Sequence, residues 1–197
     1  GAVYGPMTEG RKHLHENAPV SAMPLQSRSA YMEAKRLGEL ICSMECESHG
    51  VTATIARGFA FMGPYLPLDS HLAAPAFLQA ALCGKEIVIQ GHGQTVRSYL
   101  YGADLAIWLL TILLRGEHAR PYNIGSDIGY TINDLISLIN TITNHNIKTN
   151  VLPPRDFDCN FNILDSNKIK NELNWKAETN LTVGLTTLWN WYKTNNL

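Results

Sequence analysis

Residues 29–56 read SAYMEAKRLGELICSMECESHGVTATIA, and this stretch decides the fold class. Apolar side chains recur at helical spacing and predict a helix over residues 29–49. The apolar positions are Ala30, Ala34, Leu37, Leu40, Ile41 and Met44. Gly50 is a natural C-terminal stop for that helix. The β-branched and apolar residues 51–56 then predict a buried strand. Helix, tight turn and strand form one half of a βαβ unit.

The same alternation continues toward the C-terminus. Further helices are predicted over 72–82, 104–115, 131–144, 165–173 and 181–195, and short strands over 86–90, 97–101, 121–125 and 148–152. Thr131-Ile-Asn-Asp134 resembles a capping box, with Asp in place of the usual Glu. Helices that alternate with short strands imply an α/β protein.

Toward the N-terminus, residues 6–28 are rich in proline and glycine and predict a long loop. Gly1-Ala-Val-Tyr-Gly5 reads as the end of a strand that runs into that loop. Because there is no initiator Met, we expect the 197 residues to be a fragment of a longer protein.

The composition excludes several classes of protein. Apolar residues make up 45% and charged residues 17%, and the formal net charge is −1, so the chain is not intrinsically disordered. No basic cluster appears, so nucleic acid is not an expected partner. No run of 18 apolar residues exists, so no membrane span is expected. We expect a cytoplasmic protein.

Four cysteines, Cys42, Cys46, Cys83 and Cys159, are expected to be reduced, buried thiols. Cys42 and Cys46 share a helix face, which leaves a metal site as an alternative. No Cys or His pair elsewhere completes a set of four ligands, so no bound metal is expected.

Tyr31-Met-Glu-Ala-Lys35 places a phenol and an ammonium one turn apart on one helix face. A positive charge within ~6 Å of a phenol favours the phenolate. Tyrosine can then act as a general base or acid near neutral pH. The alternative is an ordinary surface Tyr–Lys pair, because the pattern alone is weak.

Several other patterns give Tyr31-x-x-x-Lys35 a context. They are Gly1-Ala-Val-Tyr-Gly5, Arg36 and Glu39 after Lys35, Thr54-Ile-Ala-Arg57 with Gly63-Pro64, Gly91-x-Gly93-x-x-x-Arg97-Ser-x-Leu-Tyr-x-x-Asp104, Tyr122-Asn-Ile-Gly125 and Glu172-Leu-x-Trp175. In order and spacing the chain resembles the extended short-chain dehydrogenase/reductase superfamily, and within it the NAD-dependent nucleotide-sugar epimerase/dehydratase family. The resemblance covers nearly all 197 residues.

The resemblance implies the C-terminal portion of a Rossmann-type doubly wound parallel sheet plus a small α/β substrate-binding lobe. Residues 1–57 would be the last part of an NAD(P)-binding Rossmann domain carrying the Tyr31–Lys35 helix. Residues 58–197 would be mainly the nucleotide-sugar lobe, with some segments returning to the Rossmann sheet. A homodimer is also implied, with the Tyr31 helix and the next helix packed in a four-helix bundle.

The resemblance also assigns roles. Tyr31 would remove a proton from a sugar hydroxyl, usually at C4, and Lys35 would hold the nicotinamide ribose and tune Tyr31. Tyr31, Lys35, Gly58 and Phe59 would contact the NAD (or NADP), and Ala60, Arg97 and Arg155 the nucleotide sugar. For Arg97, a structural salt bridge is the alternative, and for Arg155 an ordinary loop arginine. The product would form through a bound 4-keto sugar by epimerisation, dehydration or decarboxylation.

Two parts of the family pattern are absent from these residues. The phosphate loop G-x-x-G-x-x-G does not occur, and the family's catalytic Ser or Thr usually stands just before the position of Gly1. We therefore expect the dinucleotide to be bound mainly by a segment outside this chain, and the chain alone to be inactive. A non-catalytic nucleotide-sugar-binding module is the alternative.

Two departures bear on the substrate. The family often has Asn where this chain has Ala60, which removes a common substrate contact. The 4,6-dehydratases usually carry Asp-Glu where this chain has Gly1-Ala2. The second departure favours epimerase or reductase chemistry, with a dTDP-glucose-type 4,6-dehydratase as the alternative.

Overall fold

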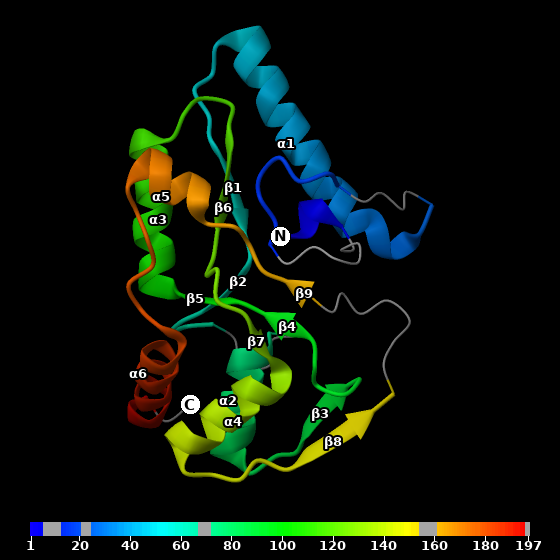
Figure 1. Ribbon diagram of the computed structural model, residues 1–197, viewed down its shortest axis with the longest axis vertical. Helices are drawn as coiled ribbons and strands as arrows, with labels where there is room; N and C mark the ends of the chain where they lie inside the picture. Colours follow the sequence, from blue (N-terminus) through cyan, green and yellow to red (C-terminus); the bar gives the residue numbers. More distant parts are fainter. Residues whose placement is uncertain (6–12, 21–24, 67–71, 154–160, 196–197) are drawn as a thin grey trace.

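The computed structural model describes residues 1–5, 13–20, 25–66, 72–153 and 161–195 (Figure 1). The helices are α1 (Ala30–His49), α2 (Ala73–Cys83), α3 (Gly102–Arg115), α4 (Ile132–Thr143), α5 (Asn167–Leu173) and α6 (Leu181–Thr194), with 3-10 turns η1 (Ala2–Tyr4) and η2 (Ser27–Ser29). The strands are β1 (Ile55–Gly58), β2 (Ala60–Met62), β3 (Ile87–Gln90), β4 (Val96–Arg97), β5 (Tyr99–Tyr101), β6 (Pro121–Ile124), β7 (Tyr130–Thr131), β8 (Thr149–Leu152) and β9 (Phe161–Asn162).

Most strand pairs are parallel, as in an α/β protein. β1 pairs with β6, β2 with β5 and β3 with β8, all in parallel, while β4 lies between antiparallel β7 and parallel β9. In Figure 1, α1 stands on one side of the β1–β6 pair, and α3 and α5 stand on the other. The predicted α/β class is confirmed.

Three apolar clusters hold these elements together. The largest joins α2, α4 and α6 to β3 and includes Leu78, Leu135 and Leu185, all fully buried. The second lies between α3, α5 and β6, where the rings of Trp108 and Trp175 are 4.3 Å apart. The third joins the N-terminal segment to the end of β1 and consists of Val3, Tyr4, Leu14, Ala18, Phe59 and Leu164.

The helix predictions are confirmed with small shifts of their ends. Gly50 and Gly84 end α1 and α2 in the left-handed conformation. The capping box at α4 is present, because the Thr131 side chain accepts from the Asp134 amide and the Asp134 side chain accepts from the Thr131 amide. No helix in the described ranges has the length and apolar character that a membrane span needs.

Three predictions about backbone were wrong. Gly1–Gly5 does not form the end of a strand, because Tyr4 N donates to Gly1 O and closes a 3-10 turn. The strand predicted over 51–56 is observed as β1, Ile55–Gly58, because its ladder begins opposite Pro121. The strand predicted over 97–101 is two strands that belong to different sheets, separated by buried Ser98.

The burial of the cysteines was also partly mispredicted. Cys46 is buried, whereas Cys42 and Cys83 are exposed, and Cys159 lies outside the described residues. Cys42 is exposed because α1 packs sparsely: Cys46 is the one buried residue among its 20. No group of three or more His, Cys, Asp or Glu side chains in the described ranges has the arrangement of a metal site.

Candidate functional site

The predicted Tyr31–Lys35 pair lies in the first turns of α1. The ammonium nitrogen of Lys35 is 5.3 Å from the centroid of the Tyr31 ring. Tyr31 is 64% exposed, and Lys35 is exposed as well. The predicted proximity on one helix face is confirmed, and both side chains are accessible to a ligand. Their chemical roles stay predictions.

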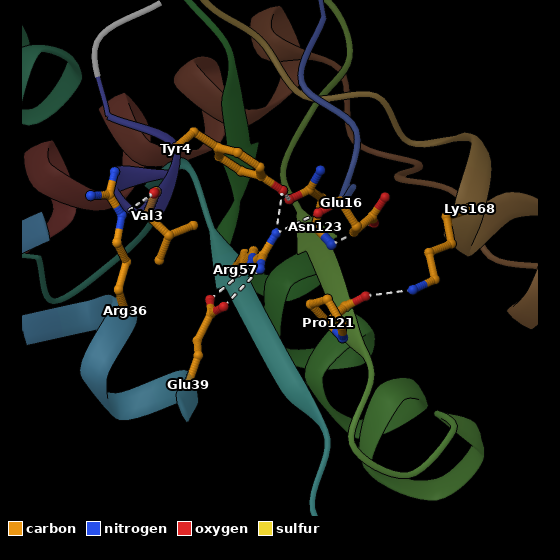
Figure 2. Close-up of polar contacts among 9 residues, drawn as sticks. All are labelled: Val3, Tyr4, Glu16, Arg36, Glu39, Arg57, Pro121, Asn123 and Lys168. Carbon is orange, nitrogen blue, oxygen red and sulfur yellow. Dashed lines mark hydrogen bonds and ion pairs between the residues drawn. The ribbon is translucent and has the colours of Figure 1, made fainter. Parts of the chain in front are cut away.

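Glu39 extends this helix face by one more turn and is bound to the sheet (Figure 2). Its two carboxylate oxygens accept from Arg57 of β1, Oε1 from Nε at 2.8 Å and Oε2 from Nη2 at 2.7 Å. Such a bidentate pair fixes both distance and orientation. Arg57 immediately precedes Gly58 and Phe59, two residues predicted to contact the cofactor.

The third guanidinium nitrogen of Arg57 binds the N-terminal segment of the chain. Nη1 donates to the Tyr4 hydroxyl at 3.0 Å and to the Glu16 carbonyl at 2.8 Å. The Tyr4 hydroxyl in turn donates to Oδ1 of Asn123 at 2.7 Å. The fully buried Asn123 also donates its side-chain amide to the Leu14 carbonyl and its backbone amide to the Glu16 carboxylate. Each polar group of Asn123 named here is therefore satisfied.

The electrostatics of this network keep the arginine charged and the phenol neutral. Burial acts to lower the pKa of Arg57, but hydrogen bonds to Glu39 and Tyr4 outweigh it, and the pKa is raised overall. Burial raises the pKa of Tyr4, although Arg57 and Asn123 oppose that shift. Tyr4 is therefore a hydrogen-bonding link and not a titrating group near neutral pH.

Two of the predicted substrate-binding residues lie together in a groove. Ala60 and Arg97 both line a cavity of about 500 Å³ between β2, β3 and α2. Gln90, Thr95 and Tyr99 contribute the other polar groups, and most of the wall is apolar. Burial raises the pKa of Tyr99 to about 12, while Arg97 opposes this shift. Tyr31 and Lys35 are not among the described residues that line this groove.

The N-terminus of α2 opens into the same groove. Its N-cap is Leu72, which has no side-chain acceptor, so among the described residues the N-cap side chain does not cap the first amides of α2, those of Ala73 and Ala74. Leu72, Ala73 and Ala74 all line the groove together with Arg97. Helix N-terminal amides and an arginine that line the same groove suit an anion such as a phosphate group. Arg97 also donates to the carbonyl of Val96 at 2.8 Å.

Three further residues were predicted to contact the cofactor or the substrate: Gly58, Phe59 and Arg155. Gly58 ends β1, and Phe59 is buried in the cluster with Tyr4 and Leu164. Phe59 therefore contributes to packing in the described chain. Arg155 lies outside the described residues.

Residue-level reasoning missed two features of the site. It did not pair Glu39 with Arg57, although Glu39 follows Tyr31 and Lys35 at the same four-residue spacing and so lies on the same helix face. It also missed the α2 N-terminus, for which Leu72 at the N-cap gives no capping signal. A helix that starts without a capping side chain leaves no positive signal in the sequence, because no Ser, Thr, Asp or Asn marks its N-cap.

Comparisons with known proteins identify the family to which the chain belongs. The sequence model of the NAD dependent epimerase/dehydratase family matches residues 1–125. UDP-glucuronic acid decarboxylase 5 of Arabidopsis thaliana is 29% identical over 162 residues, 82% of this chain and 47% of that protein. A trifunctional Arabidopsis thaliana enzyme, UDP-glucose 4,6-dehydratase/UDP-4-keto-6-deoxy-D-glucose 3,5-epimerase/UDP-4-keto-L-rhamnose-reductase, is 30% identical over 176 residues, 88% of this chain and 26% of that protein.

Solved structures of nucleotide-sugar enzymes are similar to this chain in fold. UDP-glucose 4-epimerase of Thermotoga maritima, solved with UDP-glucose, has a TM-score of 0.80 at 27% identity, covering 85% of this chain and 54% of that one. The dTDP-glucose 4,6-dehydratase of Bacillus anthracis, solved with NAD, has a TM-score of 0.86 at 22% identity, covering 99% of this chain and 60% of that one, and shows the shared fold. The chain spans about half the length, or less, of the curated relatives it matches.

Proposed function

Since the chain belongs to the NAD dependent epimerase/dehydratase family, we propose that it is part of an NAD- or NADP-dependent enzyme that converts a nucleotide sugar through a 4-keto sugar. The observation that carries this proposal is the Tyr31–Lys35 pair, in which the Lys35 ammonium is 5.3 Å from the centroid of the Tyr31 ring on an accessible helix face. Residues 1–57 would complete the dinucleotide domain, and residues 58–197 would mainly bind the nucleotide sugar.

The residues of α1 fit a dinucleotide. A phenol and an ammonium on one exposed helix face can both hydrogen-bond the hydroxyls of a ribose. The chemistry that a bound nicotinamide supplies is the acceptance and return of a hydride. Because the 197 residues contain no G-x-x-G-x-x-G segment, we assign most of the dinucleotide contacts to residues outside this chain.

The proton chemistry belongs to Tyr31. As the phenolate, its oxygen would accept a proton from a sugar hydroxyl, usually the one at C4, and return it at the end of the cycle. Lys35 would hold a ribose hydroxyl, with its ammonium beside the ring of Tyr31. The 4-keto sugar formed in this way then permits inversion at C4, if the hydride returns to the other face of the ketone, or loss of water or CO₂ at neighbouring carbons.

The groove beside β2 is proposed as the nucleotide-sugar site. Arg97 and the amides of Ala73 and Ala74 would bind the diphosphate, since a guanidinium and a helix N-terminus both favour phosphate oxygens. The apolar wall with Gln90 would take the base, and Ala60 would face the sugar. Arg155 is proposed as a second phosphate or ribose contact.

We also propose a homodimer through α1. Leu37, Leu40, Ile41 and Met44 form an exposed apolar stripe on this helix. Large exposed stripes of this kind are characteristic of interaction surfaces.

The test is turnover by the natural polypeptide that carries these residues, after its intact mass has been measured. NAD or NADP is combined in turn with UDP-glucuronic acid, UDP-glucose and dTDP-glucose. Release of CO₂, formation of a C4 epimer and formation of a 4-keto-6-deoxy sugar identify decarboxylase, epimerase and dehydratase chemistry. The similarity to a UDP-glucose 4,6-dehydratase keeps dehydration as the second candidate. Binding of UDP without any turnover would instead support a non-catalytic nucleotide-sugar-binding module.

A further inference from the structure

Helix α1 carries the proposed acid–base residues, yet its packing does little to fix its orientation. Of its 20 residues only Cys46 is buried. Its first two turns, which carry Tyr31 and Lys35, contribute no buried side chain. A helix that buries so little apolar area gains little orientation from the core. Among the described residues of one chain, polar links therefore do most to fix how its face is directed.

The strongest of these links is the ion pair between Glu39 and Arg57. The Arg57 side chain is only 12% exposed and that of Glu39 21%, so water screens the pair weakly. The guanidinium donates through all three nitrogens, to Glu39 on α1, to Tyr4 of η1 and to the Glu16 carbonyl. A second link runs beside it, where Nε of Arg36 donates to the Val3 carbonyl at 2.8 Å.

Glu39 shares its helix face with the proposed active residues. Tyr31, Lys35 and Glu39 follow at four-residue intervals, which brings them to one side of α1. Glu39 lies about 12 Å along the axis from Tyr31, at 1.5 Å per residue. A rotation of α1 about its axis would therefore move all three side chains together, and the bidentate pair opposes that rotation.

We propose that Arg57 is a positioning residue, which fixes the rotation of α1 and thereby the direction of Tyr31 and Lys35 relative to the end of β1. This inference rests on the proposed function, because it assigns Arg57 a part in the same reaction. Arg57 does not touch the reacting atoms; it acts through Glu39. The network in Figure 2 thus joins α1, η1 and β1 at one guanidinium, and reaches β6 through the Tyr4 hydroxyl.

The test compares Arg57→Met with Arg57→Lys in the natural polypeptide. Methionine keeps much of the side-chain length and removes every donor, whereas lysine keeps the charge and loses the planar fork. We expect Arg57→Met to lower kcat by about 100-fold, the scale that a small misplacement of a catalytic group produces. The KM for the nucleotide sugar should change by less than about threefold, since the groove is separate. Arg57→Lys should recover part of the lost kcat.

Arg120→Met is the matched control. Arg120 also pairs with glutamates, Glu117 and Glu172, but neither of these partners lies on α1. Its loss should leave kcat unchanged. A kcat for Arg57→Met within about threefold of the wild type, with the protein folded, would overturn the inference while leaving the proposed function intact.

Hydrogen exchange of the amides of residues 30–40 gives a readout that does not depend on turnover. We expect faster exchange there in Arg57→Met than in the wild type and in Arg120→Met. Unchanged exchange would contradict the inference even if none of the three nucleotide sugars is turned over. Failure of the wild type with all three sugars would count against the proposed function alone.

Discussion

Arg57 of β1 and Asn123 of β6 are partners in the parallel register, and both bond to the hydroxyl of Tyr4. Two neighbouring strands and the N-terminal turn therefore meet at one oxygen atom. The hydroxyl accepts a hydrogen bond from the guanidinium and donates one to the amide oxygen, so it acts as both acceptor and donor. This arrangement holds the first residues of the chain against the sheet next to the predicted cofactor contacts.

Tyr31→Phe removes the hydroxyl and keeps the ring. We expect turnover to fall by about 10²- to 10⁴-fold, the usual contribution of a general acid or base. UDP binding should persist, because the groove does not include Tyr31. The measurement is kcat together with a UDP titration by calorimetry. Turnover equal to that of the wild type would contradict the assigned role of Tyr31.

Arg97→Ala tests the proposed diphosphate contact. Loss of a hydrogen bond to a charged group should weaken UDP binding by about 10- to 100-fold. Arg115→Ala is the control, since Arg115 is exposed at the end of α3 and does not line the groove. Equal dissociation constants for the wild type and Arg97→Ala would exclude the assigned contact.

The capping box of α4 makes a pH-dependent contribution to stability. Hydrogen bonds to the side chain and the backbone of Thr131 lower the pKa of Asp134 below its ordinary value of 3.8. The folded state therefore binds this proton less tightly than the unfolded state. The contribution is present above pH 3.8 and is lost as pH falls below it, through the folded pKa.

Asp134→Asn should therefore be less stable than the wild type near neutral pH, by at most about 1 kcal/mol, and the difference should shrink in acid. Urea unfolding at several pH values measures it. Asn180→Ala is the control, because Asn180 caps α6 through its side-chain oxygen and does not titrate. A difference that is the same at every pH would show that the Asp134 carboxylate contributes nothing as a charge.

Leu40→Glu tests the proposed homodimer through α1. Leu40 is 56% exposed, and burying such a side chain contributes about 1.5–3 kcal/mol. A charge there should raise the dimer dissociation constant by more than about tenfold, measured by analytical ultracentrifugation. Leu113→Glu on α3, where Leu113 is 72% exposed, is the comparison. A dimer weakened by Leu113→Glu alone would place the interface on α3.

The parts of the fold that local signals specify could be predicted from sequence. The start of α4 was marked by Thr131 and Asp134, and the ends of α1 and α2 by Gly50 and Gly84. The ends of β1 could not be predicted, because its ladder is set by Pro121, far along the chain. The split between β4 and β5 was equally hidden, since an alternating pattern does not show which sheet a strand joins.

The candidate site likewise has a part that could be predicted from the sequence and a part that could not. The Tyr31–Lys35 pair follows from helical spacing, and the structure confirms its geometry. The Arg57–Glu39 pair joins residues 18 positions apart on different elements, so only the packing of α1 against β1 brings them together. The meeting of Ala60 and Arg97 in one groove likewise depends on the tertiary fold.

The break at Ser98 has a mechanical consequence. Arg97 belongs to the sheet of β7, β4 and β9, while Tyr99, two residues later, pairs with Ala60 in the sheet of β2 and β5. The groove is therefore lined by strands of three sheets, β2 with β5, β3 with β8, and β4 with β7 and β9, and the first and third of these sheets meet at Ser98 without a shared ladder. A diphosphate held by Arg97 and the N-terminus of α2 would connect the sheet of β4 to that helix. Ligand binding should then restrict the motion of the sheet of β4 relative to α2, including at residues that the ligand does not touch.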